Sequence, residues 1–101
     1  MDMQYALREG VLTVRLFGEL GHHEAIQGMA RLAGLVEDLL PGGFLLELSG
    51  LDFMDSSGIA VILQTARKCR ACGCRFAVRG TPPQAKRVLT AAGIQRLVGL
   101  E

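Results

Sequence analysis

The feature that most constrains the fold is a short apolar run at residues 44–48, Phe-Leu-Leu-Glu-Leu, which lies between two segments of helical character. A run of this length and composition is typical of a β-strand that is covered on both faces. Pro41-Gly42-Gly43 ends the segment before it, and a strongly apolar segment begins soon after it. Because strands that alternate with helices form crossover connections, the chain is expected to build a largely parallel sheet with helices packed on it.

The first forty residues extend this pattern. Residues 3–8 and 11–17 alternate apolar and polar side chains and meet at Glu9-Gly10, which indicates a β-hairpin. An amphipathic helix is predicted from about His22 to Leu40, because apolar residues recur there at three- and four-residue steps. Its inward positions would be Ile26, Met29, Ala33, Val36 and Leu40.

The second half of the chain continues the alternation of strands and helices. A helix is predicted from about Ser57 to Cys72, followed by a strand at residues 75–79. Thr81, Pro82 and Gln84 have the spacing of a capping box, which predicts a third helix that ends at Gly93. That helix would turn Ala85, Val88, Leu89 and Ala92 inward, and a last strand would follow at about residues 95–100. The predicted order is β-β-α-β-α-β-α-β, an α/β fold with one mixed sheet, in a single domain over residues 1–101.

Composition excludes several classes of protein. A net charge of +1 gives no general attraction to nucleic acids or acidic membranes. The charges are divided unevenly, since residues 1–55 carry nine acidic and three basic side chains, and residues 56–101 carry one and eight. No signal peptide or membrane-spanning run is recognisable, and an odd number of cysteines, three, predicts reduced thiols and a cytoplasmic location.

The tetrapeptide Asp55-Ser56-Ser57-Gly58 carries the main functional signal. It places two hydroxyls at the start of a helix, where unpaired backbone N–H groups and the positive end of the helix dipole would hold a phosphate. The alternative interpretation is an ordinary helix cap, for which Asp and Ser are both favoured. The apolar residues of the preceding segment, among them Leu51 and Phe53, suggest a loop that is packed or offered to a partner. Gly58 would let another protein approach the serines closely.

Four segments resemble STAS domains, the anti-sigma-factor antagonists of bacteria. Asp55-Ser56-Ser57-Gly58, between a strand and an apolar helix, resembles the phosphorylation loop of that family. Residues 18–23 (Gly-Glu-Leu-Gly-His-His), 51–63, 83–87 and 92–94 are similar to matching segments of the family's sporulation member. Two departures stand out: Gly21 lies where the family has Asp, at the expected helix cap, and the chain ends without the C-terminal helix that the family usually carries.

The resemblance implies a regulatory protein without an active site or cofactor. In its unmodified form it would bind an anti-sigma factor that is also a serine kinase, and so release a sigma factor, with sporulation as the expected process. Phosphorylation of Ser56 would end that binding, and a PP2C-type serine phosphatase would restore it. The expected contact residues are Met54, Asp55, Ser57, Gly58 and Ile59, with Gly21, His22 and His23 at the rim. The chain would be a monomer or weak dimer, and the alternative role is a docking subunit of a stress-signalling or lipid-transport assembly.

Other chemistries have weaker signals. Hydrolysis by Ser56 with His22 or His23 as base lacks a Gly-x-Ser-x-Gly motif, and nucleotide binding lacks a glycine-rich fingerprint. Adjacent histidines on a helix diverge by about 100°, so they suit a single metal ion poorly. Cys69, Cys72 and Cys74 resemble half a zinc site without its second half. A cluster of basic residues lacks the interleaved aromatics of a nucleic-acid surface, which favours solvated surface or an acidic protein partner; it comprises Arg67, Lys68, Arg70, Arg75, Arg79, Lys86 and Arg87.

Overall fold

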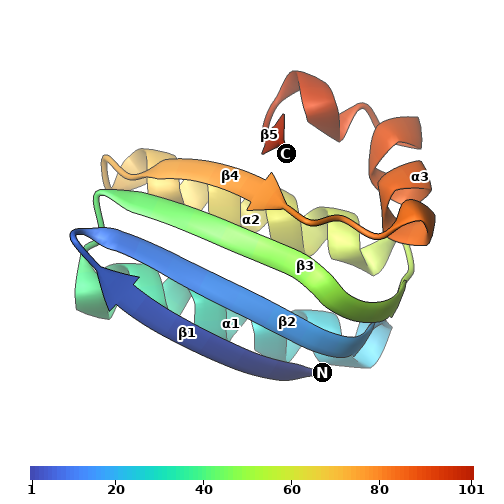
Figure 1. The fold of residues 1–101 in the computed structure, drawn as a ribbon, viewed down its shortest axis with the longest axis horizontal. Helices are drawn as coiled ribbons and strands as arrows, with labels where there is room; N and C mark the ends of the chain where they lie inside the picture. The colour runs from blue at the N-terminus through green and yellow to red at the C-terminus, as the bar shows by residue number, and fades with distance from the viewer.

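The computed structural model describes all residues, 1–101, as one five-stranded sheet with three α-helices (Figure 1). The elements, in chain order, are β1 (Asp2–Arg8), β2 (Val11–Leu20), α1 (His22–Leu39), β3 (Gly43–Met54), α2 (Ser57–Ala71), β4 (Arg75–Arg79), α3 (Pro83–Ala91), the 3-10 helix η1 (Ile94–Arg96) and β5 (Gly99–Leu100). This order confirms the predicted α/β fold with a mixed sheet.

The order of strands across the sheet is β1-β2-β3-β4-β5, the same as their order in the chain. Strands β1 and β2 are antiparallel, and every later neighbouring pair is parallel. Helices α1 and α2 lie side by side on one face of the sheet, whereas α3 lies beyond the end of β3 and η1 lies next to β5 at the edge of the sheet (Figure 1). None of the helices is long and apolar enough to cross a lipid bilayer.

The hairpin between β1 and β2 turns at Glu9-Gly10, as predicted. Both residues have positive φ, 51° at Glu9 and 79° at Gly10. Two consecutive residues of this kind match the twist of the flanking strands, and a glycine at the second position adopts that backbone without strain. The local sequence therefore determines this turn.

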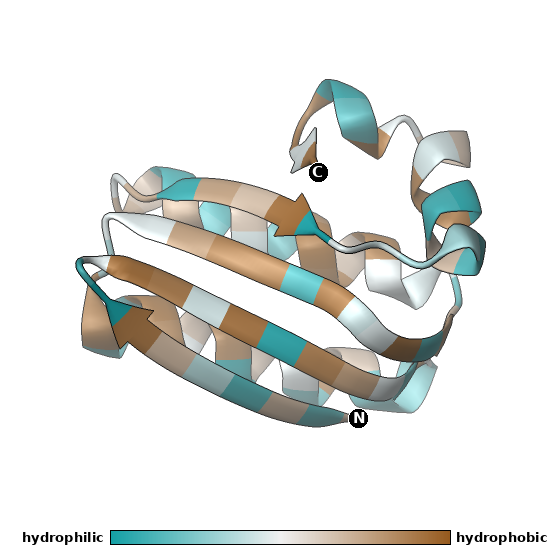
Figure 2. Cartoon of the chain, viewed as in Figure 1, coloured by the Kyte–Doolittle hydropathy of each residue, from teal (hydrophilic) through white to brown (hydrophobic).

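Strand β3 is covered on one face only, so the expectation of cover on both faces was wrong. Leu46 and Leu48 are fully buried against the helices, whereas Glu47 lies on the open face. There the Glu47 carboxylate contacts Arg15 Nε at 3.3 Å and accepts a hydrogen bond from Arg79 Nη2 at 2.8 Å. The bond from Arg79 lowers the pKa of Glu47 from its usual value of 4.5. Figure 2 shows the resulting alternation of hydrophobic and hydrophilic bands along β2 and β3.

Helix α1 packs through a different face from the one predicted. Its buried residues are Ala25, Gly28, Leu32 and Val36, so of the predicted inward set only Val36 is fully buried. Ile26 is 65% exposed, and Leu40 is 73% exposed in a left-handed conformation just after the helix. The small residues Ala25 and Gly28 allow close packing, since a Cβ on Gly28 would lie 2.9 Å from the Met1 side chain.

The C-terminal third departs most from the prediction. Helix α3 begins at Pro83 with Pro82 as its N-cap, and Thr81 is not a cap, because its buried hydroxyl has no hydrogen-bond partner. Ala85 and Leu89 are buried as predicted and Val88 is partly buried, but Ala92 is exposed. The predicted strand at residues 95–100 is mostly the 3-10 helix η1, and only Gly99–Leu100 pair with β4.

Candidate functional site

The predicted serine pair lies at the junction of β3 and α2. Strand β3 ends at Met54, Asp55 and Ser56 form the link, and α2 begins at Ser57. The link sits next to the start of α1, because the Asp55 N–H donates a hydrogen bond to the Leu20 carbonyl at 3.3 Å. The structure therefore joins two segments that are more than thirty residues apart in the sequence.

Asp55, and not Ser56, supplies the side chain that caps α2. Asp55 Oδ1 accepts a hydrogen bond from the Ser57 N–H at 2.8 Å. Ser56 occupies the N-cap position with helical dihedrals (φ −62°, ψ −18°) and makes no side-chain capping bond. Its side chain is exposed. An ordinary capping role accounts for Asp55 but leaves the Ser56 hydroxyl without a structural task.

Of the N–H groups expected to be unpaired around the serines, only that of Ser56 has no hydrogen-bond partner. The Ser57 N–H bonds to Asp55 Oδ1, the Gly58 N–H to the Asp55 carbonyl at 3.0 Å, and the Ile59 N–H to the Ser56 carbonyl at 3.1 Å. The first turn of α2 is thus satisfied by the chain itself. A phosphate on Ser56 would have to compete with the Asp55 carboxylate for the Ser57 N–H.

Two of the predicted contact residues face the interior. Met54 is 0% exposed and Gly58 is also buried. A Cβ added at Gly58 would lie 2.5 Å from Met54 Cγ, closer than real Cβ contacts allow. Gly58 therefore makes room for the Met54 side chain beneath it, and these two residues support the turn instead of lining its outer surface.

The remaining predicted residues lie at or near the surface on both sides of Ser56. Asp55, Ser57 and Ile59 are half-buried, and His22 and His23 are exposed on the first turn of α1. Gly21 is the N-cap of α1, as predicted, and a Cβ there would lie 3.5 Å from Asp55 Oδ2 and 3.6 Å from Glu24 Oε2. The start of α1 and the serine turn therefore form one continuous surface.

Ile26 adds an apolar side chain to the same helix face. It follows His22 and His23 by one helical turn and is 65% exposed. The sequence pattern placed Ile26 in the core, so this residue was missed as a surface residue. The buried residues Ala25, Gly28, Leu32 and Val36 also recur at three- and four-residue steps, so an apolar face that begins at Ala25 would have been the correct prediction.

Gln84 is the second residue that the sequence did not reveal as part of the site. Its side-chain amide forms two hydrogen bonds with the backbone of Met54. Gln84 Oε1 accepts from the Met54 N–H at 2.9 Å, and Gln84 Nε2 donates to the Met54 carbonyl at 2.7 Å. Because the pairing of β3 with β4 ends at Glu47 and Arg79, the amide of α3 takes over the hydrogen bonding that a neighbouring strand would provide. Gln84 therefore fixes the residue that leads into the serine turn.

The Ser56 hydroxyl and the two histidines are not hydrogen-bonded to each other. The rings of His22 and His23 instead contact each other edge to face, with centroids 5.9 Å apart. No cluster of three or more His, Cys, Asp or Glu side chains is placed to hold a metal ion. The cysteines lie at the other end of α2, where burial raises the pKa of Cys69 to about 12.

Comparison with known proteins agrees with this geometry. The family model of the STAS domain matches residues 2–101. The chain is 32% identical to the anti-sigma F factor antagonist of Lysinibacillus sphaericus over 93 residues, covering 92% of this chain and 79% of that protein. It is 34% identical to the anti-sigma F factor antagonist of Paenibacillus polymyxa over 100 residues, covering 97% of this chain and 86% of the relative.

Solved structures of the anti-sigma factor antagonist SpoIIAA share the fold. The unphosphorylated form aligns with a TM-score of 0.83 at 25% identity and covers 99% of this chain and 88% of its own. The phosphorylated form of SpoIIAA from Bacillus aligns with a TM-score of 0.75, also at 25% identity, over 99% and 91% of the two chains. The similarity therefore extends over nearly the whole of both molecules.

Proposed function

Since this chain belongs to the STAS-domain family, we propose that it is an anti-sigma-factor antagonist that is switched by phosphorylation of Ser56. The unmodified protein binds an anti-sigma factor that is also a serine kinase, and this binding releases the sigma factor that the kinase holds. Phosphorylated protein dissociates, and a PP2C-type phosphatase restores the active form. The process takes place in the cytoplasm and, by analogy with the relatives named for sigma F, in sporulation.

The observation that carries the proposal is the free hydroxyl of Ser56. A protein kinase needs a hydroxyl that is accessible and not engaged in the fold. Ser56 is exposed and makes no capping bond, because Asp55 performs that task. The neighbouring Ser57 is half-buried inside the first turn of α2, which makes it the poorer substrate. The existence of a phosphorylated form of SpoIIAA supports a modification of this kind.

Charge explains why phosphorylation would end the contact. A phosphoserine adds about −1.5 to −2 charges at neutral pH. At Ser56 this charge would lie next to Asp55, and Asp55 and Glu24 already flank the Gly21 position at 3.5 and 3.6 Å. The new charge would therefore join two carboxylates on a surface that also holds the exposed Ile26. A partner that packs against this surface would have to desolvate the whole group, which is costly without paired cations.

Gly21 keeps this surface less acidic than the family pattern. The STAS proteins that the sequence resembles have Asp at this position. In this chain an Asp side chain would start between Asp55 and Glu24 and would add a third carboxylate. We infer that Gly21 lowers the electrostatic repulsion of the unmodified form and leaves more of the switching to the phosphate.

The test is mass spectrometry after incubation with the cognate anti-sigma kinase and ATP. We expect one phosphate per chain on Ser56, none on a Ser56→Ala variant, and unchanged phosphorylation of the matched Ser57→Ala variant. In binding assays, Ser56→Ala should bind the kinase with or without ATP, and Ser56→Asp should not bind. Equal affinity of the Ala and Asp variants would contradict the proposal, and intact binding without phosphate would identify a constitutive docking subunit.

A further inference from the structure

Strand β1 is the outermost strand of the sheet, and β2 is its only neighbour in this chain (Figure 1). The two strands pair over all seven residues of β1, from Asp2 opposite Phe17 to Arg8 opposite Val11, without a bulge. Strand β1 also contains no proline and no lysine. Natural edge strands commonly carry such features, which prevent them from pairing with another chain. The free edge of β1 is therefore unprotected.

The hairpin turn determines which backbone groups of β1 lie on this free edge. Glu9-Gly10 is a two-residue turn, so Arg8 and Val11 on either side of it form a hydrogen-bonded pair. Along an antiparallel strand the backbone groups alternate in direction, so the even-numbered residues of β1 bond to β2. The other N–H and C=O groups point toward the free edge, and they belong to Met3, Tyr5 and Leu7.

The side chains of β1 form an apolar row and a polar row. The apolar row, Met3, Tyr5 and Leu7, lies on the face of the sheet that carries the helices, because each of these residues is paired with a buried residue of β2. Tyr5 is nevertheless 56% exposed and Leu7 is 43% exposed, so the helices leave this row partly uncovered. The polar row lies on the other face and has opposite charges at its two ends; it comprises Asp2, Gln4, Ala6 and Arg8.

We propose that β1 pairs with β1 of a second copy of this chain, so that two five-stranded sheets join into one continuous sheet. The two strands run antiparallel, with the twofold axis at Tyr5. In this register all residues of both strands are paired, and the outward backbone groups of one copy meet those of the other. Met3 faces Leu7 of the second copy, and Tyr5 faces its own equivalent. A shift of the register by two residues would leave the ends of β1 unpaired.

The same register aligns opposite charges. Asp2 of one copy faces Arg8 of the second copy, and the reverse pair forms at the other end of the strand. Both are non-hydrogen-bonded pairs, in which opposing side chains approach each other most closely. Opposite charges in such cross-strand pairs stabilise an antiparallel sheet, whereas like charges destabilise it. Because both charge pairs form only with Tyr5 at the axis, the charges select this register and favour a second copy as the partner.

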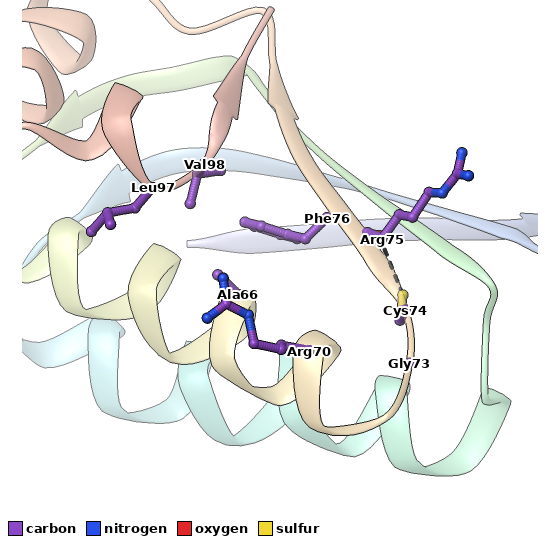
Figure 3. A pocket seen from close by; sticks show the side chains of 8 residues that line it. All are labelled: Ala66, Arg70, Gly73, Cys74, Arg75, Phe76, Leu97 and Val98. Atoms are coloured by element: carbon purple, nitrogen blue, oxygen red, sulfur yellow. Dashed lines mark hydrogen bonds between the residues drawn. The ribbon is translucent and has the colours of Figure 1, made fainter.

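This pairing leaves the serine turn free. The turn lies at the end of β3, which is separated from β1 by β2. Since the two β1 strands run antiparallel, the two serine turns lie at opposite ends of the joined sheet, and each copy can exchange its own partner independently. The hollow beside Phe76 of β4 (Figure 3) is three strands away from β1, so it takes no part in the pairing.

Sedimentation velocity of the full-length protein over a range of concentrations tests the proposal. We expect a reversible equilibrium of monomer and dimer with a dissociation constant in the micromolar range, as is typical of a small interface. Asp2→Arg and Arg8→Asp should each weaken dimerisation about tenfold, because each places like charges opposite one another. The double variant Asp2→Arg/Arg8→Asp exchanges the two charges, so it should restore the dissociation constant to within about threefold. A protein that stays monomeric, or a double variant as weak as the single variants, would overturn the proposal.

A second pair of variants separates the edge of β1 from general surface effects. Tyr5→Lys places two positive charges at the twofold axis and should weaken dimerisation by at least about tenfold, while the exposed position keeps the fold intact. Phe53→Lys is the matched control, because it replaces an aromatic residue that is 44% exposed on β3, two strands from the free edge. It should leave the dissociation constant within about twofold. Equal losses in the two variants would mean that association depends on total charge, which would refute the pairing.

Amide hydrogen exchange shows whether the backbone of β1 takes part. The outward amides of Met3, Tyr5 and Leu7 should exchange about tenfold more slowly as the protein concentration is raised through the dissociation constant. Those of Gln4 and Ala6, which bond to β2, should not change. Dimerisation without slower exchange at the outward amides would place the interface elsewhere and overturn the proposal. Protection of these amides in a protein that stays monomeric would show that another segment of the same chain occupies the edge, which would also overturn it.

Discussion

Replacement of Gln84 by Ala tests whether one side-chain amide holds the serine turn in place. The amide of Gln84 forms two hydrogen bonds to the backbone of Met54, at 2.9 and 2.7 Å, across thirty residues of sequence. Ala removes both partners at once and leaves the N–H and the carbonyl of Met54 unpaired. The change deletes no buried apolar surface of the main core, because Gln84 lies at its edge.

The expected cost follows from these two bonds. A net contribution of about 1 kcal/mol for each hydrogen bond gives a loss of about 2 kcal/mol in the free energy of unfolding. Water can reach the part-buried site and replace some of the lost bonding, so the penalty for fully buried unpaired groups does not apply in full. For a domain of about 100 residues, 2 kcal/mol corresponds to a fall of about 8–16 °C in Tm.

Urea unfolding measures the loss, and hydrogen exchange shows where it occurs. Gln27→Ala on the exposed face of α1 is the matched control, and it should change stability by less than about 0.5 kcal/mol. In Gln84→Ala the Met54 amide should lose protection, because its hydrogen-bond acceptor is gone. Equal stability of the two variants would refute the reasoning. Loss of protection at the first turn of α3 with Met54 unchanged would also refute it, and would assign Gln84 to a helix cap.

Three further predictions follow from packing and charge. Gly58→Ala should lower the free energy of unfolding by about 1–3 kcal/mol, because the added Cβ would overlap the Met54 side chain. In the control Gly34→Ala the added Cβ would meet nothing within 4 Å, so this variant should be neutral or stabilising. Urea unfolding of both variants measures the difference. Ellman's reagent at neutral pH should modify the exposed Cys72 rapidly. It should modify the buried Cys69 only on unfolding, because burial raises the pKa of Cys69 to about 12 and keeps this residue in the unreactive thiol form. Glu47 has a lowered pKa, so its contribution to stability is present above pH 4.5 and is lost as the pH falls through its pKa in the folded state. Glu47→Gln should therefore be less stable than the unmodified protein at neutral pH, and this difference in stability should shrink as the pH falls below 4.5 and through the folded-state pKa.

The serine turn could be predicted from sequence because its signals are local. A strand, an acidic residue, two serines and an apolar helix follow one another without interruption, and the structure places Ser56 at the start of that helix as expected. The same holds for the hairpin at Glu9-Gly10 and for the Gly21 cap of α1. In each case neighbouring residues determine the backbone, so periodicity and turn chemistry suffice.

The errors arose where contacts between distant residues decide the outcome. Gln84 has the spacing of a capping residue, but its amide bonds to Met54, and no local pattern reveals a partner thirty residues away. Ile26 has the right spacing for the core of α1, yet the helix turns Ala25 and Gly28 inward, and the Met1 side chain packs close to Gly28. The sequence of β3 predicts burial on both faces because Leu45 is apolar although it lies on the open face. Glu47, two residues later on the same face, pairs with Arg15 and Arg79 there.

The order of the strands has a consequence for how the chain is assembled during synthesis. Each strand from β2 onward pairs with the strand that precedes it in the chain, so every new strand joins an edge that already exists. No completed strand pair has to open to admit a later one. The elements β1, β2, α1 and β3, which surround the serine turn, all precede it in the chain and are therefore synthesised before it. When Ser56 is added, the strands and the helix start against which its turn will pack are already part of the growing chain.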